Sequence, residues 1–137
     1  MSLPEGFSPA MSWKTRLVSI KQLPKGYGVS YGLNYHTSQE EKIGVIPVGY
    51  GDGLRRQPGN QVLINEQLVN IVGNVCMDQC MIQLDGLKYV SIGDEVVVIG
   101  SQGNHSITAL DRAEAWNTIT YEIVCGMANR LPRIYIE

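Results

Sequence analysis

Turn-forming residues interrupt this sequence so often that only short apolar segments remain between them up to about residue 107. Several of these segments alternate apolar and polar residues or are rich in β-branched side chains, as strands are. Because no helical pattern separates them, they cannot form parallel βαβ units. The sequence therefore predicts a mainly β fold: a closed six-stranded Greek-key barrel with one or two short helices near the C-terminus.

The expected strands are short and are bounded by turn signals. They cover residues 13–20, 28–35, 42–48, 62–64, 67–72, 76–84 and 95–100. Asn65-Glu66 has the length of a two-residue hairpin connection. Helix is expected only after Thr108, which forms a capping signal with Asp111, and again over residues 119–127. An extended segment over residues 130–136 closes the chain.

Length and charge limit the class of protein. A chain of 137 residues with 44% hydrophobic residues supports one domain, residues 11–137, after a lead-in over residues 1–10 that begins with Met1-Ser2-Leu3, a cloning remnant in our interpretation. The net charge of −2 argues against a nucleic-acid partner. No apolar run approaches the roughly 18 residues that cross a bilayer, so a cytoplasmic location is expected.

The three cysteines are an odd number without a secretory context, which favours reduced thiols. Cys76 and Cys80 have C-x₃-C spacing, but no second pair or nearby histidine completes a zinc site, so no metal is expected. Cys76 is expected to be buried and inert, because no histidine lies close in sequence to activate its thiol. His36 and His105 occur in polar turn regions and are expected to be exposed.

Three segments could supply chemistry, and each has a structural alternative. The segment Gly73-Asn74-Val75-Cys76-Met77-Asp78-Gln79 joins a thiol, a thioether and a carboxylate at an abrupt bend. Met77 would ordinarily be core packing, whereas Asp78 is unusual in a strand and favours a bend or a site. Tyr50 is surrounded by three glycines, which indicates a sharp turn or a close approach, and Asp52 would ordinarily be an Asx-turn residue.

Tyr31, in Val29-Ser30-Tyr31-Gly32, is the candidate proton-transfer group. A phenol has an ordinary pKa of about 10, so only about one in a thousand is ionised at pH 7, a cost of roughly 4 kcal/mol. A cationic neighbour would have to lower this cost, and the sequence identifies none. The alternative is a strand tyrosine that packs its ring and leaves its hydroxyl in water.

As a set, five segments resemble the C-terminal β-domain of the pyridoxal-phosphate-dependent alanine racemases. They are residues 12–17, 29–32, 43–53, 72–79 and 130–133, which occur in family order and at family spacing. The resemblance implies a larger enzyme whose N-terminal (β/α)₈ barrel, absent from this chain, carries pyridoxal 5′-phosphate on a lysine. It implies a homodimer in which this domain completes the partner subunit's active site. The isolated domain is accordingly expected to be inactive.

The same resemblance assigns roles by motif. Tyr31 would be the tyrosine base that works opposite the lysine, as the enzyme interconverts L- and D-alanine for cell-wall precursors. Met77 would contact the substrate carboxylate through its backbone N–H, with Tyr50 and Asp78 at the inner entrance. Asp52 and Arg56 would belong to the outer mouth, and no residue of this chain is expected to hold the cofactor.

Two positions depart from the family pattern. Asn129 stands where a second entrance tyrosine is usual, and Asn74 stands where an arginine is frequent. An amide at 129 could hydrogen-bond a substrate hydroxyl, which predicts activity on serine as well as alanine. In this respect the chain resembles the membrane-anchored serine/alanine racemases of vancomycin-resistant bacteria, which would change the location to the membrane.

Two alternatives remain open on the sequence. One is the β-domain of a fold-related pyridoxal-phosphate-dependent amino-acid decarboxylase, although the Met77-Asp78-Gln79 continuation and the Tyr31 segment favour a racemase. The other is a non-catalytic barrel that serves only dimerisation.

Overall fold

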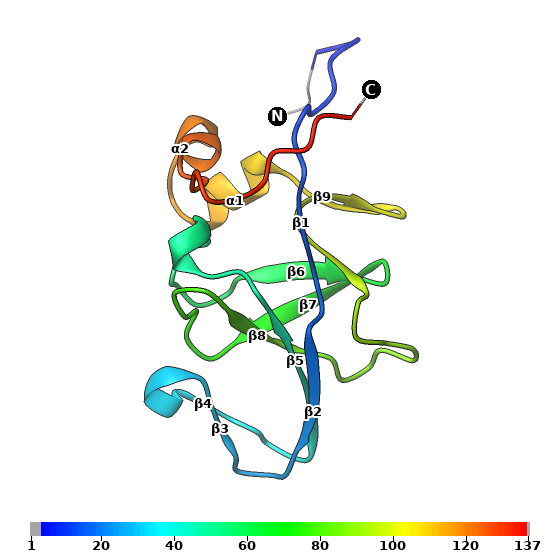
Figure 1. The fold of residues 1–137 in the computed structure, drawn as a ribbon, viewed down its shortest axis with the longest axis vertical. Coiled ribbons are helices and arrows are strands. Elements are labelled where there is room, and N and C mark those ends of the chain that lie inside the picture. Colours follow the sequence, from blue (N-terminus) through cyan, green and yellow to red (C-terminus); the bar gives the residue numbers. More distant parts are fainter. Residues whose placement is uncertain (1–3, 137) are drawn as a thin grey trace.

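The computed structural model describes residues 4–136, so the interpretation of Met1-Ser2-Leu3 lies outside the described residues. Short strands dominate the fold (Figure 1). The strands are β1 (Trp13–Arg16), β2 (Ser19–Leu23), β3 (Gly28–Val29), β4 (Tyr35–His36), β5 (Glu41–Ile46), β6 (Gln61–Ile64), β7 (Gln67–Val72), β8 (Cys80–Gln83), β9 (Glu95–Gln102) and β10 (His105–Ile107). Two 3₁₀ turns, η1 (Tyr31–Leu33) and η2 (Tyr50–Asp52), and two helices, α1 (Ala109–Ala115) and α2 (Thr120–Cys125), complete it.

The main sheet is antiparallel and follows the order β1-β9-β6-β7-β8-β5-β2, with β10 paired to β9. Its first and last strands are consecutive in sequence. The Leu17 N–H donates to the Asp94 carbonyl next to β9, whereas the Val18 N–H donates to Val45 of β5. The chain therefore changes partners at this point, which explains why the expected strand over residues 13–20 is two strands.

The mainly β class with two short helices is confirmed, but the closed six-stranded barrel is not. Among residues 4–136 no ladder of hydrogen bonds joins β1 to β2, so the sheet is a continuous path of seven strands with β10 attached. The Asn65-Glu66 connection is confirmed, since both residues have positive φ values of 48° and 61° in the two-residue turn between β6 and β7.

The core lies on both faces of β9. Val96 and Val98 join the main cluster, which includes Leu17, Ile64 and Trp116. Val97 points to the other face, where it packs with Leu63 and Ile107 in a small cluster. Ile107 comes from β10, a strand that the sequence did not predict, and its burial shows what that strand contributes.

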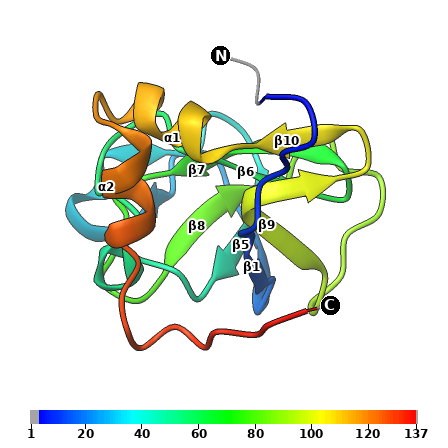
Figure 2. The ribbon, with the colours of Figure 1, turned by 90° about the horizontal axis from the view of Figure 1, so that it is seen from above.

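The helices lie together at one side of the sheet (Figure 2). Thr108 caps α1 as predicted: its Oγ1 accepts from the Asp111 N–H at 3.0 Å, and its own N–H donates to Asp111 at 2.6 Å. Asn117, with φ of 52°, breaks the helical path before α2, which ends at Cys125, earlier than predicted. No helix within residues 4–136 is long and apolar enough to cross a membrane.

Two expected strands are interrupted where the chain forms turns. Residues 28–35 contain the η1 turn between β3 and β4, and these elements form an arm, residues 26–37, at the end of the sheet opposite the helices (Figure 1). Residues 76–79 are not strand; β8 begins only at Cys80. The Cys76 N–H donates to the Gln79 carbonyl at 2.9 Å and closes a bend at this point. Residues 130–136 form no strand.

Candidate functional site

The η2 turn lies directly on the backbone of the segment over residues 73–79. The Tyr50 N–H donates to the Cys76 carbonyl at 3.0 Å, and the Gly51 N–H donates to the Met77 carbonyl at 2.9 Å. A Cβ at Gly49 would lie 2.1 Å from the Cys76 carbonyl oxygen, so only glycine permits this contact. The glycines around Tyr50 therefore mark a close approach of two backbones, one of the two interpretations that the sequence allowed.

Arg130 connects this turn to the Asp78 side chain. Its Nε donates to Asp52 at 2.8 Å, and its guanidinium donates to Asp78 at 2.6 Å. Asp52 is buried, and its second oxygen accepts from the Gly49 N–H at 2.9 Å. The two carboxylates, Asp52 first, raise the pKa of the Arg130 guanidinium. Sequence reasoning gave Arg130 no role, because nothing in its own segment shows which distant carboxylates it meets.

The arm that carries Tyr31 is attached to the same segment through Asn74. The Asn74 side chain donates to the Tyr31 carbonyl at 2.7 Å, and the Ser30 hydroxyl donates to the Asn74 carbonyl at 2.5 Å. Three elements that are distant in sequence, the arm, the η2 turn and residues 127–130, therefore meet around residues 73–78. We call this surface the rim.

The rim exposes the side chains that the sequence singled out. Tyr31 is 73% exposed, Met77 54% and Tyr50 45%. Asp78 and Asn129 are also exposed, and Asn129 directly precedes Arg130. The structure therefore brings the segments of all five predicted site residues to one surface.

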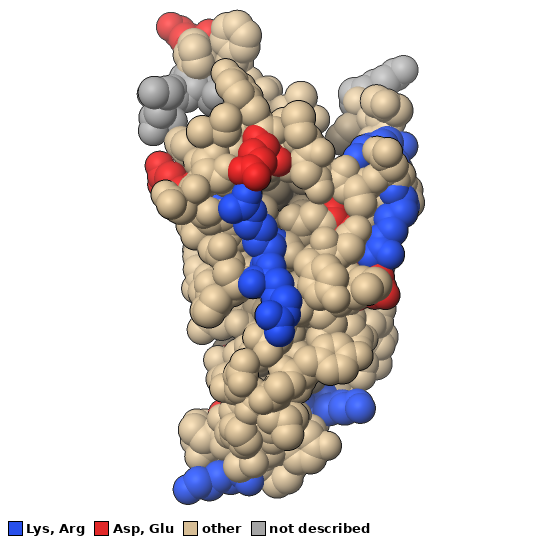
Figure 3. Space-filling view, turned by 90° about the vertical axis from the view of Figure 1, so that its left-hand side faces the viewer, with Lys and Arg blue, Asp and Glu red and all other residues tan. Residues whose placement is uncertain are grey.

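Figure 3 shows the side of the molecule that carries η2 and α2. Two elongated groups of Lys and Arg side chains flank a largely uncharged surface there, each with acidic side chains close by. The arginines that belong to the segments beside η2 and after α2 are Arg55, Arg56, Arg130 and Arg133. Carboxylates offset part of this positive charge, because Glu122 pairs with Arg55, and Asp52 and Asp78 pair with Arg130.

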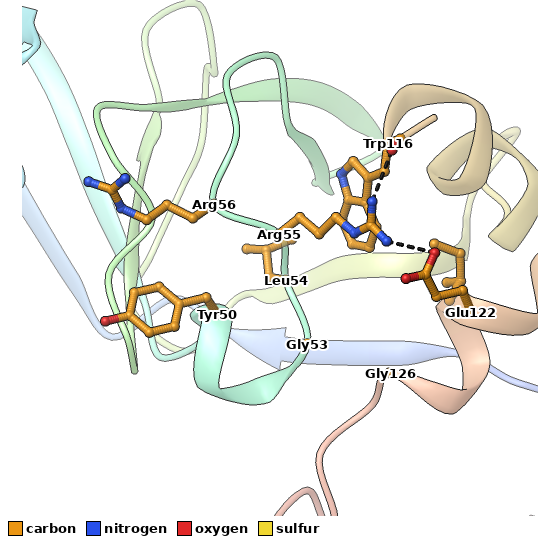
Figure 4. A pocket seen from close by; sticks show the side chains of 9 residues that line it. Tyr50, Gly53, Leu54, Arg55, Arg56, Trp116, Glu122 and Gly126 are labelled. Atoms are coloured by element: carbon orange, nitrogen blue, oxygen red, sulfur yellow. Dashed lines mark hydrogen bonds and ion pairs between the residues drawn. The ribbon is translucent and has the colours of Figure 1, made fainter. Parts of the chain in front are cut away.

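An open pocket of about 360 Å³ lies between η2 and α2 (Figure 4). Arg55 points toward the helices, where it donates to the Trp116 carbonyl at 3.0 Å and pairs with Glu122 at 2.8 Å. Arg56 and Tyr50 extend in the opposite direction, away from these partners (Figure 4). Arg56 lines this pocket, whereas Asp52, which was predicted to lie at the outer mouth with it, is buried beneath the turn.

Two of the three thiols, Cys76 and Cys80, are buried, whereas Cys125 is exposed. Cys76 is buried, as expected, with its sulfur 3.5 Å from the Ser30 hydroxyl. Burial raises the pKa of the Cys80 thiol to about 12, which makes it a poor nucleophile. His36 and His105 are exposed. Within residues 4–136, no three His, Cys, Asp or Glu side chains gather as metal ligands would.

Comparisons with known proteins identify the family of this chain. The family profile described as "Alanine racemase, C-terminal domain" matches residues 10–135. The alanine racemase of Halothermothrix orenii is 50% identical over 129 residues, which are 93% of this chain and 34% of that protein. This chain belongs to the alanine racemase family, as its C-terminal domain. The match favours the racemase alternative over the decarboxylase alternative.

Solved alanine racemases share the fold closely. The crystal structure of alanine racemase from Bacillus anthracis with bound L-Ala-P superposes with a TM-score of 0.93 at 45% identity, covering 98% of this chain and 35% of that one. The histidine racemase from Leuconostoc mesenteroides subsp. sake gives a TM-score of 0.87 at 36% identity, covering 100% and 37%. The chain thus spans about a third of the length of its alanine racemase relatives.

Proposed function

We propose that this domain completes the active site of a full-length alanine racemase, with Tyr31 acting as a proton-transfer base toward the partner subunit. The single observation that carries the proposal is the exposure of the Tyr31 side chain on the rim that also exposes Met77. A tyrosine that served only packing would bury its ring, whereas this ring is available to a second polypeptide.

The remaining rim residues suit the binding of a small amino acid. Among the described residues, the Met77 N–H donates no hydrogen bond, so it is available to a substrate carboxylate. The Cys76 carbonyl accepts from the Tyr50 N–H and the Met77 carbonyl accepts from the Gly51 N–H, so the peptide groups on both sides of Met77 are held. The Tyr50 backbone is bonded to the residue before Met77, and the Asp78 side chain after it is held by Arg130.

Pyridoxal phosphate would be bound by another domain, and this chain would contact the substrate that the cofactor carries. None of the rim segments contains the lysine that the cofactor requires, since the chain's lysines are Lys14, Lys21, Lys25, Lys42 and Lys88. When bound, the cofactor supplies the electron sink that makes the substrate Cα–H acidic. This chain would supply a phenol on one face of that carbon, a backbone N–H for the carboxylate, and walls that limit access of water.

Two parts that the proposed mechanism needs would come from other domains or subunits. Within residues 4–136, the Tyr31 hydroxyl forms no hydrogen bond, so the group that tunes it would come from the other subunit of a homodimer. The cofactor-binding barrel would come from an N-terminal domain of the same enzyme. We propose that such an enzyme supplies D-alanine for cell-wall precursors in the cytoplasm, or at the membrane if an anchor precedes the barrel.

The decisive experiment removes the phenolic oxygen of Tyr31. Tyr31→Phe in the full-length, cofactor-loaded enzyme is expected to slow alanine racemisation by about 10²- to 10⁴-fold, the usual contribution of a positioned base. Tyr89→Phe is the matched control, because Tyr89 is 82% exposed and lies outside the rim. Equal activity of the two variants, measured by the rate of optical rotation change, would remove the proposed role.

We further propose that Asn129 admits serine. Asn129 is exposed, and its neighbour Arg130 is held by Asp52 and Asp78. The family resemblance to a histidine racemase supports the idea that this fold accepts substrates with other side chains. An amide that pairs with a substrate hydroxyl discriminates more strongly than a pocket that only fits a methyl group.

The test for serine compares two substrates in one variant. Asn129→Tyr should reduce kcat/KM for serine at least about tenfold more than for alanine, because the hydroxyl loses its partner. Asn104→Tyr places the same ring in the exposed turn between β9 and β10 and should leave the ratio unchanged. An equal reduction for both substrates in Asn129→Tyr would exclude this role.

A further inference from the structure

We propose that Asn74 is a positioning residue, which fixes the tip of the arm and thereby sets where the phenolic oxygen of Tyr31 lies. The inference rests on the proposed function of Tyr31. We define the arm tip as residues 30–34 and the arm base as the paired residues around Tyr27 and Thr37.

The backbone of the arm tip adopts conformations that are unfavourable without support from surrounding contacts. Ser30, Gly32 and Leu33 have φ values of 67°, 75° and 48°, in the left-handed region. For serine, and more so for leucine, this region is sparsely populated and costs conformational free energy. Such a conformation persists only where surrounding contacts determine it, so the tip needs an external support.

Asn74 supplies that support from two sides. Its side-chain amide donates to the Tyr31 carbonyl at 2.7 Å, and its backbone carbonyl accepts from the Ser30 hydroxyl at 2.5 Å. The two bonds hold consecutive residues of the tip to one residue of the rim. Within the described residues, no other side chain donates to the Tyr31 backbone.

The close packing of the two loops makes this support rigid. A Cβ at Gly73 would lie 2.8 Å from the Ser30 Cβ and 2.9 Å from the Val29 carbonyl oxygen, so the backbones touch. Gly73 itself has φ of 70°, which presents Asn74 toward the tip. At the arm base, the Thr37 N–H donates to Tyr27 at 3.0 Å, and that bond restrains only the far end of the arm.

The position of the Tyr31 ring therefore depends on its backbone. The side chain is 73% exposed, and among residues 4–136 its hydroxyl has no hydrogen-bond partner that could hold it. A displacement of about 1 Å at a reacting group can reduce the rate on the order of 10²-fold. Loosening the tip should consequently affect proton transfer without unfolding the domain.

The first test measures the tip directly in the chain. Asn74→Ala should speed amide hydrogen exchange at Leu33 by about tenfold, because its N–H bond to Ser30 then opens by local motion. The amides of Tyr27 and Thr37 should keep their rates. Asn70→Ala is the matched control, since Asn70 accepts a bond from Gln61 on an exposed strand face.

The second test measures proton transfer in the full-length, cofactor-loaded enzyme. Asn74→Ala and the isosteric Asn74→Asp should lower kcat by about 10- to 100-fold while KM changes by less than about threefold. The isotope effect with Cα-deuterated alanine should rise more for one enantiomer than for the other, because only one proton transfer uses Tyr31. Asn70→Ala should match the wild type.

The outcomes separate this inference from the proposed function. Faster exchange confined to the tip, together with an enantiomer-dependent isotope effect, supports it. Wild-type exchange at Leu33, or equal acceleration at the arm base, overturns it. If Tyr31→Phe retained full activity, the proposed function would fail, but the exchange measurement would still decide whether Asn74 holds the tip.

Discussion

Two tyrosines of the same arm have opposite environments. The Tyr31 ring is exposed at the tip, and among the described residues its hydroxyl has no partner. Tyr35, on β4, is half-buried and donates its hydroxyl to Glu41 at 2.5 Å. Burial first, and then the bond and charge of Glu41, raise the pKa of Tyr35 to about 12.

The difference shows that environment, and not residue type, decides what a phenol can do. Glu41 is almost fully buried, and it accepts from the Ser38 N–H at 2.8 Å and from Gln83 at 3.3 Å as well as from Tyr35. This cluster joins the arm to β5 and β8. Tyr35 is thus committed to structure, whereas Tyr31 at the arm tip presents an exposed phenol to a partner.

The largest expected effect on folding comes from removing the acceptor of this cluster. Glu41→Ala should lower the free energy of unfolding by about 3 kcal/mol, because the Tyr35 hydroxyl and the Ser38 N–H lose their partner in a buried site. Urea unfolding of the chain measures this change. Glu40→Ala, at the exposed neighbouring position, should change stability by less than about 0.5 kcal/mol. Similar values for the two variants would show that the cluster does not hold the arm.

Local signals allowed parts of the fold to be predicted from the sequence. The Asn65-Glu66 turn and the capping box of Thr108 and Asp111 depend on residues within a few positions of each other, so their patterns are visible in the sequence. The start of β8 was placed too early, because the carbonyls of Cys76 and Met77 bond to η2 instead of a neighbouring strand. That competition depends on a distant segment.

The candidate site likewise contains residues that motifs reveal and residues that only the structure reveals. Tyr31, Met77 and Tyr50 belong to recognisable motifs, and the structure shows all three exposed on the rim. Arg130 and Asn74 act through contacts with Asp52, Asp78 and the Tyr31 backbone, which lie far away in sequence. A single sequence carries no signal for such pairs, so their supporting roles could only be found in three dimensions.

A smaller effect on the free energy of unfolding is expected from the titration of Glu41 with pH. Burial alone would raise the pKa of Glu41, but the bonds from Tyr35, Ser38 and Gln83 together lower it below 4.5. The unfolded chain therefore takes up this proton at a higher pH than the folded chain, so the group's stabilisation is complete above about pH 4.5 and is lost as the pH falls through the folded pKa.

The measurement compares wild type with Glu41→Gln, which removes the titration while keeping the side-chain size. The difference in unfolding free energy should be constant from pH 7 to about 5 and should narrow toward pH 3. For Tyr35, whose pKa rises from 10.0 to about 12, the stabilisation is complete below pH 10 and should decrease above it. If the difference in unfolding free energy between wild type and Glu41→Gln widened as the pH fell, the pKa of Glu41 would not be lowered in the folded chain.

The smallest effects come from exchanging each tyrosine for phenylalanine, and they test the comparison itself. Tyr35→Phe should destabilise the chain by about 1.5 kcal/mol, because Glu41 loses one donor but retains Ser38 and Gln83. Tyr31→Phe should change stability by less than about 0.5 kcal/mol, because an exposed hydroxyl without a partner contributes little. In the full-length enzyme the order should reverse, with Tyr35→Phe close to wild-type activity. A loss of stability in Tyr31→Phe as large as that in Tyr35→Phe would mean that the tip phenol is a structural group after all.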